Sequence, residues 1–175
     1  MRSRFAAPSA RLALAAVAAV AVTAAATTTA VATTDSRSNA VRACATGDLS
    51  FKVSLESQAG GYFLVTAKAK AGITCYLEGV FPAASFGSSA DTEVAPAEHS
   101  VSERVTVSGS TAAYAGINPK TTNGDHGKQF DFLHLSVAGD ETDAVTLPLP
   151  ETATVERPVA NNWHADPADA VPFAN

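Results

Sequence analysis

The chain's only two cysteines, Cys44 and Cys75, enclose two segments in which polar and apolar residues alternate. In residues 49–55 every second position is apolar, and serine or lysine fills the positions between. A period of two with aromatic and β-branched residues is typical of a half-buried strand. Residues 62–69 return as a second strand after a turn at 58–61 that ends in Gly-Gly. The sequence therefore predicts a β-hairpin between the cysteines.

Further short strands are predicted along the rest of the chain. A third strand begins at Cys75 and ends at Phe81-Pro82, because proline cannot donate into a strand ladder. The segments 83–97 and 118–128 contain residues typical of loops. The other predicted strands are 99–107, 111–117, 129–138 and 143–149. Short strands separated by turns, with no helical spacing beyond the N-terminal segment, predict an all-β fold, an antiparallel β-sandwich of immunoglobulin-like type.

The N-terminus has the pattern of a secretory signal peptide. Three arginines precede or open an uncharged stretch at 12–32 that ends in small residues. A basic start, an apolar run and a small-residue exit are the parts of such a signal. We expect residues 1–32 to be removed, with an Ala-rich site nearer Ala26 as the alternative cleavage point, and 33–43 to form a flexible lead-in. The protein is then expected to be secreted, extracellular or cell-wall associated, without stable membrane insertion. The alternative is an uncleaved anchor, since about 20 apolar residues can cross a bilayer.

The two cysteines are expected to form a disulfide. An exported chain enters an oxidising space, where an even number of cysteines favours pairing. There is no CxxC motif, and two cysteines alone cannot complete a tetrahedral zinc site. A Cys44–Cys75 bond would tie together the open end of the hairpin and its flanks. A loop of about 30 residues would contribute roughly 3–4 kcal/mol in the chain-entropy model. The alternative is two free buried thiols.

The net charge argues against nucleic acid as a partner. The chain has 12 Lys and Arg against 17 Asp and Glu, a formal net charge of −5. Removal of Arg2, Arg4 and Arg11 with the signal would lower it to −8, because that segment contains no acidic residue. Such a surface repels phosphate backbones, and the sequence contains no basic patch to reverse the effect.

Sequence signatures of catalysis are absent. There is no Gly-x-Ser-x-Gly elbow, no HExxH and no phosphate-binding glycine loop. A Ser-His-Asp set can be assembled in many ways, and no spacing selects one of them. We therefore expect no enzyme activity, no catalytic residue and no cofactor. A secreted hydrolase is a weaker alternative.

Metal binding has two weak signals. Residues 140–143 (DETD) place three carboxylates in one turn, which suits calcium, although the spacing is not that of an EF-hand. The histidines, with Asp125 or Asp166, offer ligands for zinc or copper, yet no two share a face at a characteristic spacing. These histidines are His99, His126, His134 and His164. We expect solvated side chains in both cases and no metal site.

Recognition is the broadest remaining class of function, because sandwich domains bind through loops or a sheet face with little trace in the sequence. The contact elements we expect are the loop 118–128, with Asn123 and His126, and Trp163 in the C-terminal tail 151–175. Exposed aromatic side chains often anchor a partner. The alternative is that Trp163 packs on its own domain, with the tail laid across a sheet edge.

The spacing of several residues resembles one known family. A cysteine followed by Asp-Leu and an alternating strand, and a hairpin ending in a C-x-L-x-G motif with a nearby proline, are similar to the secreted actinobacterial domain of unknown function 4232 family. The resemblance covers residues 44–150 and implies an exported sandwich domain with no assigned reaction. The matching positions are Cys44, Asp48, Leu49, Cys75, Leu77, Gly79, Pro82 and the run from Val105 to Ala115.

Together these observations predict one exported, monomeric sandwich domain at 44–150. We expect it to bind an extracellular or cell-wall ligand or protein and to catalyse nothing. A structural envelope protein without a specific ligand is the alternative, and it predicts self-association instead of a binding surface.

Overall fold

The computed structural model describes residues 40–172. Regular structure in these residues consists of strands and short 3-10 turns, which confirms the all-β class. The expected signal at 1–32 lies outside the described residues, as does most of the lead-in at 33–43. The described residues form one compact unit. Within that part of the chain, no helix has the length and apolar character needed to span a membrane.

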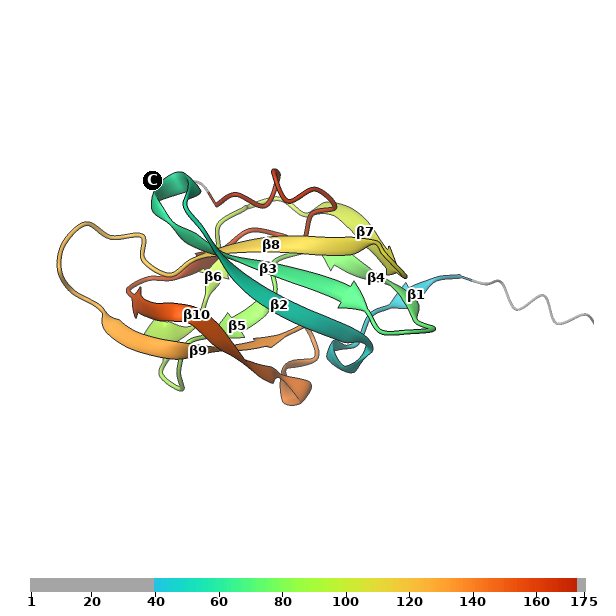
Figure 1. The fold of residues 1–175 in the computed structure, drawn as a ribbon, viewed down its shortest axis with the longest axis horizontal. Helices are drawn as coiled ribbons and strands as arrows, with labels where there is room; N and C mark the ends of the chain where they lie inside the picture. Colours follow the sequence, from blue (N-terminus) through green and yellow to red (C-terminus); the bar gives the residue numbers. More distant parts are fainter. Residues whose placement is uncertain (1–39, 173–175) are drawn as a thin grey trace, which may run out of the picture. The chain divides into compact units, whose positions relative to one another are not determined.

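The largest sheet has five strands in the order β2-β3-β8-β11-β6 (Figure 1). β2 and β3 pair antiparallel from Leu49 opposite Ala69 to Glu56 opposite Tyr62, so the hairpin predicted from the alternation is confirmed. The turn η2 (Gln58–Gly60) joins them. The five strands are β2 (Leu49–Glu56), β3 (Tyr62–Ala69), β8 (Ala112–Asn118), β11 (Val159–Ala160) and β6 (Ala95–Pro96).

Two three-stranded sheets complete the fold. Their orders are β1-β4-β7 and β10-β9-β5. The pairs β1–β4 and β11–β6 are parallel, so the expectation of a purely antiparallel sandwich is corrected. The strands are β1 (Arg42–Ala43), β4 (Thr74–Gly79), β7 (Ser102–Ser108), β10 (Val145–Val155), β9 (Lys128–Ser136) and β5 (Ala83–Ser85). The remaining 3-10 turns are η1 (Thr46–Asp48), η3 (Ala90–Thr92) and η4 (Glu141–Asp143).

One hydrophobic core joins all three sheets. It contains Phe63 of β3, Leu77 of β4 and Leu133 of β9, each no more than 2 % exposed. β3 is buried on its other face as well, because Tyr62 and Leu64 pack against the C-terminal segment around Ala170. This second contact explains why β3 is buried almost continuously where its sequence alternates only in part.

The close packing of the C-terminal segment depends on a glycine. A Cβ atom at Gly116 of β8 would lie 2.0 Å from the carbonyl oxygen of Ala170, so only glycine fits there. The tail thus belongs to the folded domain up to the end of the described residues.

Several expected boundaries differ from the observed ones. β10 runs past residue 150 to Val155, so the domain boundary expected at 150 falls inside a strand. Arg42 and Ala43 form β1 instead of belonging to a flexible lead-in. The segment 83–97, expected to be a loop, contains β5, η3 and β6. Strands of two or three residues are too short to show a period, and their pairing depends on distant partners.

β10 is interrupted at its prolines. Its pairing with β9 shifts between Pro148 and Ala153, where β10 has more residues than its partner. Pro148 and Pro150 lack the amide hydrogen that a regular ladder needs, and prolines in sheets are found at edges and bulges. β10 is accordingly at the edge of its sheet.

Candidate functional site

Cys44 and Cys75 form the predicted disulfide. The two cysteines are 6 % and 0 % exposed. Arg42 of β1 lies opposite Cys75 of β4, and the Cys44 amide donates to the carbonyl of Tyr76 at 2.9 Å. The disulfide therefore crosslinks strands that already pair. A buried disulfide is a structural staple, because thiol exchange requires access for an attacking thiolate.

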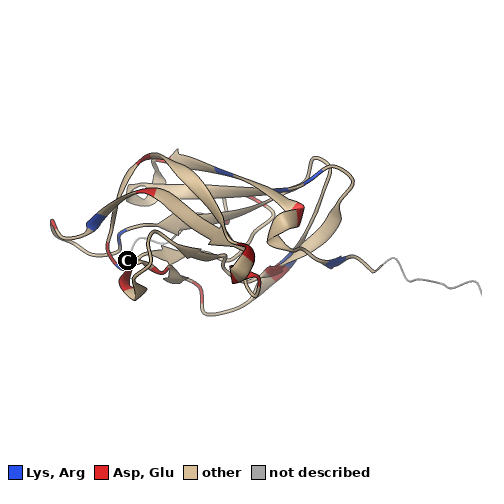
Figure 2. Cartoon of the chain, turned by 90° about the horizontal axis from the view of Figure 1, so that it is seen from below, with Lys and Arg blue, Asp and Glu red and all other residues tan. Residues whose placement is uncertain are grey.

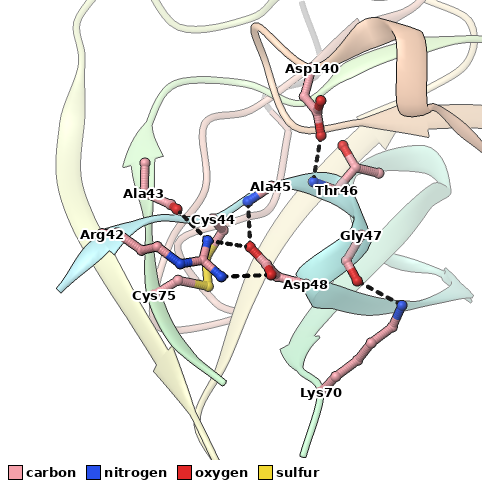
Figure 3. Close-up of polar contacts among 10 residues, drawn as sticks. All are labelled: Arg42, Ala43, Cys44, Ala45, Thr46, Gly47, Asp48, Lys70, Cys75 and Asp140. Atoms are coloured by element: carbon pink, nitrogen blue, oxygen red, sulfur yellow. Dashed lines mark hydrogen bonds and ion pairs between the residues drawn. A yellow bond between two sulfur atoms is a disulfide. The ribbon is translucent and has the colours of Figure 1, made fainter. Parts of the chain in front are cut away.

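Polar contacts of Asp48 close the turn beside the disulfide (Figure 3). The Arg42 guanidinium donates to both carboxylate oxygens of Asp48, at 2.6 and 2.8 Å. The Ala45 amide donates to the same carboxylate at 2.7 Å. These hydrogen bonds, with that from Arg42 the strongest, lower the pKa of Asp48 to about 2. The chain on either side of Cys44 is thus held by an ionised carboxylate.

Thr46 connects this turn to η4. Its amide donates to the carboxylate of Asp140 at 2.7 Å, and its hydroxyl accepts from the Val137 amide at 3.0 Å. The bond from the Thr46 amide lowers the pKa of Asp140. We call the disulfide with the contacts of Arg42, Thr46, Asp48 and Asp140 the clasp.

Two of the three carboxylates in the acidic turn at 140–143 accept hydrogen bonds from backbone amides. Asp140 accepts from Thr46, and Glu141 accepts from the Gly139 amide at 2.8 Å. Across residues 40–172 no group of three His, Cys, Asp or Glu side chains is arranged to hold a metal ion.

A second polar cluster is centred on Glu98. Its carboxylate accepts from the Asn162 side chain at 2.9 Å and from the Ser102 hydroxyl at 3.2 Å, and it lies 3.0 Å from Nε2 of His164. Ser102 and His164 therefore both bond to Glu98 instead of to each other. This is not the arrangement of a serine nucleophile with its base. The cluster fastens the tail to the segment before β7.

A cleft of about 800 Å³ lies beside the start of β9 and the end of β10, which are the ends of these two strands that lie away from the clasp. Three separate segments form it: the η3–β6 region, the loop between β8 and β9, and the corner between β10 and β11. Its volume is in the range of small-molecule sites. The lining residues are Ala90, Asp91, Glu93, Ala95, Thr121, Gly127, Lys128, Val155, Glu156, Arg157, Pro158 and Val159.

The cleft is charged, and most of its charges are paired. Lys128 Nζ lies 2.7 Å from the Asp91 carboxylate, and Lys120 Nζ lies 3.0 Å from that of Glu156. The Thr122 hydroxyl also donates to Glu156, and this bond together with Lys120 lowers the pKa of Glu156. Figure 2 shows acidic and basic positions scattered over the described part of the chain.

Arg157 has an unusual backbone conformation at the cleft wall. Its φ is 52°, in the left-handed region, which costs a residue with a side chain about 1–2 kcal/mol. The loop 119–122 holds it there. The Thr121 hydroxyl donates to the Arg157 carbonyl at 2.8 Å, and the Glu156 amide donates to the Pro119 carbonyl at 3.0 Å. The corner is therefore held by hydrogen bonds within the domain.

The loop residues that were expected to contact a partner lie outside the larger cleft. Asn123 and His126 are exposed on the loop between β8 and β9. Asn123 lines a smaller hollow of about 310 Å³ with Gly60 and Gly61. The backbone carbonyl of His126 accepts from Lys120 Nζ. The loop expected from its composition thus borders both hollows, and neither Asn123 nor the His126 ring lines the larger one.

Trp163 lies in the core and is 1 % exposed. Its ring centroid is 6.5 Å from that of Phe51, and its amide donates to the carbonyl of Val80 at 3.2 Å. Of the two alternatives for this residue, the structure places it within its own domain. The reason is β11, which inserts between β8 and β6 and directs the following residues inward.

The sequence pattern did not predict the charged residues of the cleft, above all Arg157 and Glu93, as part of a site. The only local signal is the Glu-Arg-Pro sequence at 156–158, where two charged residues precede a proline directly after a strand. Glu93 gives no signal, because its segment has no clear pattern and its strand is short.

The match to a known family extends over nearly all of the folded domain. The model of the family described as Domain of unknown function (DUF4232) matches residues 44–166. The match includes both cysteines, the cleft residues and Trp163, and it extends beyond the 44–150 region over which the sequence motifs resemble the family. No curated protein and no solved structure matches the chain. With most of its length matched, this chain belongs to the DUF4232 family.

Proposed function

We propose that this protein is an exported, non-catalytic binding domain whose ligand occupies the cleft formed by residues 90–95, 121–128 and 155–159. The observation that supports this most strongly is Arg157. It is kept in a left-handed conformation by hydrogen bonds from a separate loop, while its guanidinium makes no ion pair with another described residue. Strained positions that the surrounding structure fixes are concentrated at ligand sites.

The lining of the cleft favours binding over catalysis. It contains lysine, arginine and carboxylate groups and the Thr121 hydroxyl, but neither histidine, serine nor cysteine. The histidine closest to such a role, His164, bonds to Glu98 in the other polar cluster. The carboxylates of Asp91 and Glu156 are engaged by lysines, and the Thr121 hydroxyl donates to a backbone carbonyl. The lining therefore leaves one carboxylate without an ion pair, whereas carboxylate-based hydrolysis of glycosides uses two.

The finer fold assignment and the location belong to the same proposal. We assign the three sheets to an immunoglobulin-like sandwich, supported by the single core that they share. Export is supported by the pattern of residues 1–32, by a buried disulfide and by the resemblance to secreted actinobacterial proteins. The partner we expect is an extracellular or cell-wall molecule, and the domain acts as a monomer.

Export is tested by mass spectrometry of the protein recovered from culture medium. We expect the first residue to be Thr33, as removal of residues 1–32 requires. Protein found only in the membrane fraction with an intact N-terminus would contradict this part of the proposal.

Binding is tested by recording amide NMR spectra of the purified protein with and without a digest of the producing cells' walls. We expect shifts concentrated in the three cleft segments, and their loss in Arg157→Gln. Arg104→Gln is a matched control, because this arginine pairs with Glu78 at 2.8 Å on a different sheet. Spectra unchanged by wall digest and by concentrated medium would contradict the proposal.

A further inference from the structure

We infer that the cleft binds a zwitterionic ligand, an amino acid or short aliphatic peptide with a free carboxylate and a free ammonium group. The inference rests on the proposed function, because it assigns a ligand chemistry to the same cleft. It is carried by the two charges of the cleft that the protein leaves unpaired.

Those two charges have opposite signs. Lys128 is neutralised by Asp91, and Glu156 by Lys120, at 2.7 and 3.0 Å. Arg157 and Glu93 also line the cleft, and neither side chain makes an ion pair or hydrogen bond within the described part of the chain. One guanidinium and one carboxylate are therefore available to a ligand.

The sheet register brings Arg157 and Glu93 to the same region. β11 and β6 are parallel, with Val159 opposite Ala95, and each charged residue lies two positions before its strand's paired residue. The Ala95 amide donates to the Pro158 carbonyl at 2.9 Å, which keeps the two segments together. The left-handed turn at Arg157 changes the chain direction there, and the two side chains form no ion pair with each other.

The chemistry of each group selects one end of a zwitterion. A guanidinium binds a carboxylate through two parallel hydrogen bonds, and a carboxylate accepts from the three donors of an ammonium group. A phosphate-rich ligand is disfavoured, because Asp91, Glu93 and Glu156 surround the site and the chain is acidic. We therefore expect a ligand with one negative and one positive charge.

The rest of the cleft suits an aliphatic body. Ala90, Ala95, Val155, Pro158 and Val159 supply its apolar wall. The volume of about 800 Å³ exceeds the space that one small amino acid fills, which favours a short peptide. Small aliphatic side chains would bury apolar area without adding a charge that the cleft cannot pair.

The test is a calorimetric titration of the purified protein with four probes: alanyl-alanine, its N-acetyl form, its C-terminal amide and free alanine. We expect alanyl-alanine to bind about tenfold more tightly than either blocked form, since each block removes a charge-assisted interaction. Weaker binding of alanine identifies the ligand as a peptide. Equal binding of alanine supports the zwitterion and identifies a single amino acid.

Two variants test which residue binds which end of the ligand. Arg157→Gln is expected to abolish the preference for a free carboxylate, and Glu93→Gln the preference for a free ammonium group. Arg104→Gln is the control and should bind like the wild type. Melting curves verify that each variant is folded.

Three results would overturn the inference: no heat from any probe at millimolar concentration, equal binding of blocked and free dipeptides, or the same loss of affinity in Arg104→Gln. If the probes fail while wall digest still shifts the amides of the cleft, the zwitterion is wrong and the binding site stands. If both fail, the proposed function falls as well.

Discussion

The two ends of the β2–β3 hairpin are held in opposite ways. At the end near Leu49, the clasp combines a buried covalent bond with carboxylates whose hydrogen bonds are all made within the protein. At the other end, the loop between β8 and β9 borders an open cleft with an unpaired arginine. Figure 1 shows β1 and that loop on opposite sides of the domain. The first end contributes stability, and the second is the end to which our proposal assigns ligand binding.

The sharpest test of this division is Trp163→Ala. Trp163 lines a cavity together with Cys44, so it belongs to the stable half, and it is 1 % exposed. We expect a loss of about 3–5 kcal/mol in the free energy of unfolding, as for large buried aromatic residues. Urea unfolding measures it, with the exposed Phe132→Ala as the control. A loss below about 1 kcal/mol would show that the tail is not part of the core.

Removal of the disulfide is the next largest effect. The bond closes a loop with a sequence separation of 31, and the double variant Cys44→Ser/Cys75→Ser should lose about 3–4 kcal/mol of stability. Thermal and urea unfolding of wild type and variant provide the measurement. If oxidised and reduced wild type melt at the same temperature, the clasp does not depend on its covalent bond.

Acid should weaken the clasp. The pKa of Asp48 is lowered to about 2 from an ordinary value of 3.8, so its contribution is complete above pH 4 and is lost as the pH falls towards 2. After screening by solvent, we expect it to amount to about 1–2 kcal/mol. Urea unfolding from pH 2 to 7 should show this loss in the wild type and a smaller one in Asp48→Asn. Identical pH profiles would exclude Asp48 as the titrating group.

The smallest stability effect is expected at Arg157. Arg157→Gln should change the free energy of unfolding by no more than about 0.5 kcal/mol, as for other exposed sites. Arg157→Gly should be equal or more stable, because glycine adopts positive φ without strain. Both variants should lose the preference for a ligand with a free carboxylate. A loss of more than about 2 kcal/mol in Arg157→Gln would make this residue structural and remove the contrast between the two ends.

The hairpin and the disulfide were predictable because their signals are local. Alternation in residues 49–55 predicts β2 whatever lies elsewhere, and two cysteines allow only one intramolecular pair. β5, β6 and β11 were not predictable, because each has two or three residues and exists only through a distant partner. Pro96 in β6 even argues against a strand in sequence, whereas the sheet accepts it at its edge.

The candidate site was predictable only as a region. The loop 118–128 was identified from its turn residues, and it does border the cleft. Its charged partners Glu93 and Arg157 come from segments without a pattern, and they meet only through the parallel β11–β6 pair. Trp163 illustrates the reverse case, since an aromatic residue in a proline-rich tail gives the same signal whether it lies at the surface or in the core.

The position of β11 sets a limit on when the molecule can fold. This strand lies between β8 and β6, yet it is the last of the described strands in the chain, and β6 has no other neighbour in its sheet. Until β11 has been added to the chain, the largest sheet lacks the strand that completes it. Because pairing between segments far apart in sequence is slow, we expect this sheet to be completed late in folding. If the chain is exported, as we propose, that delay keeps it open for passage through a translocation channel.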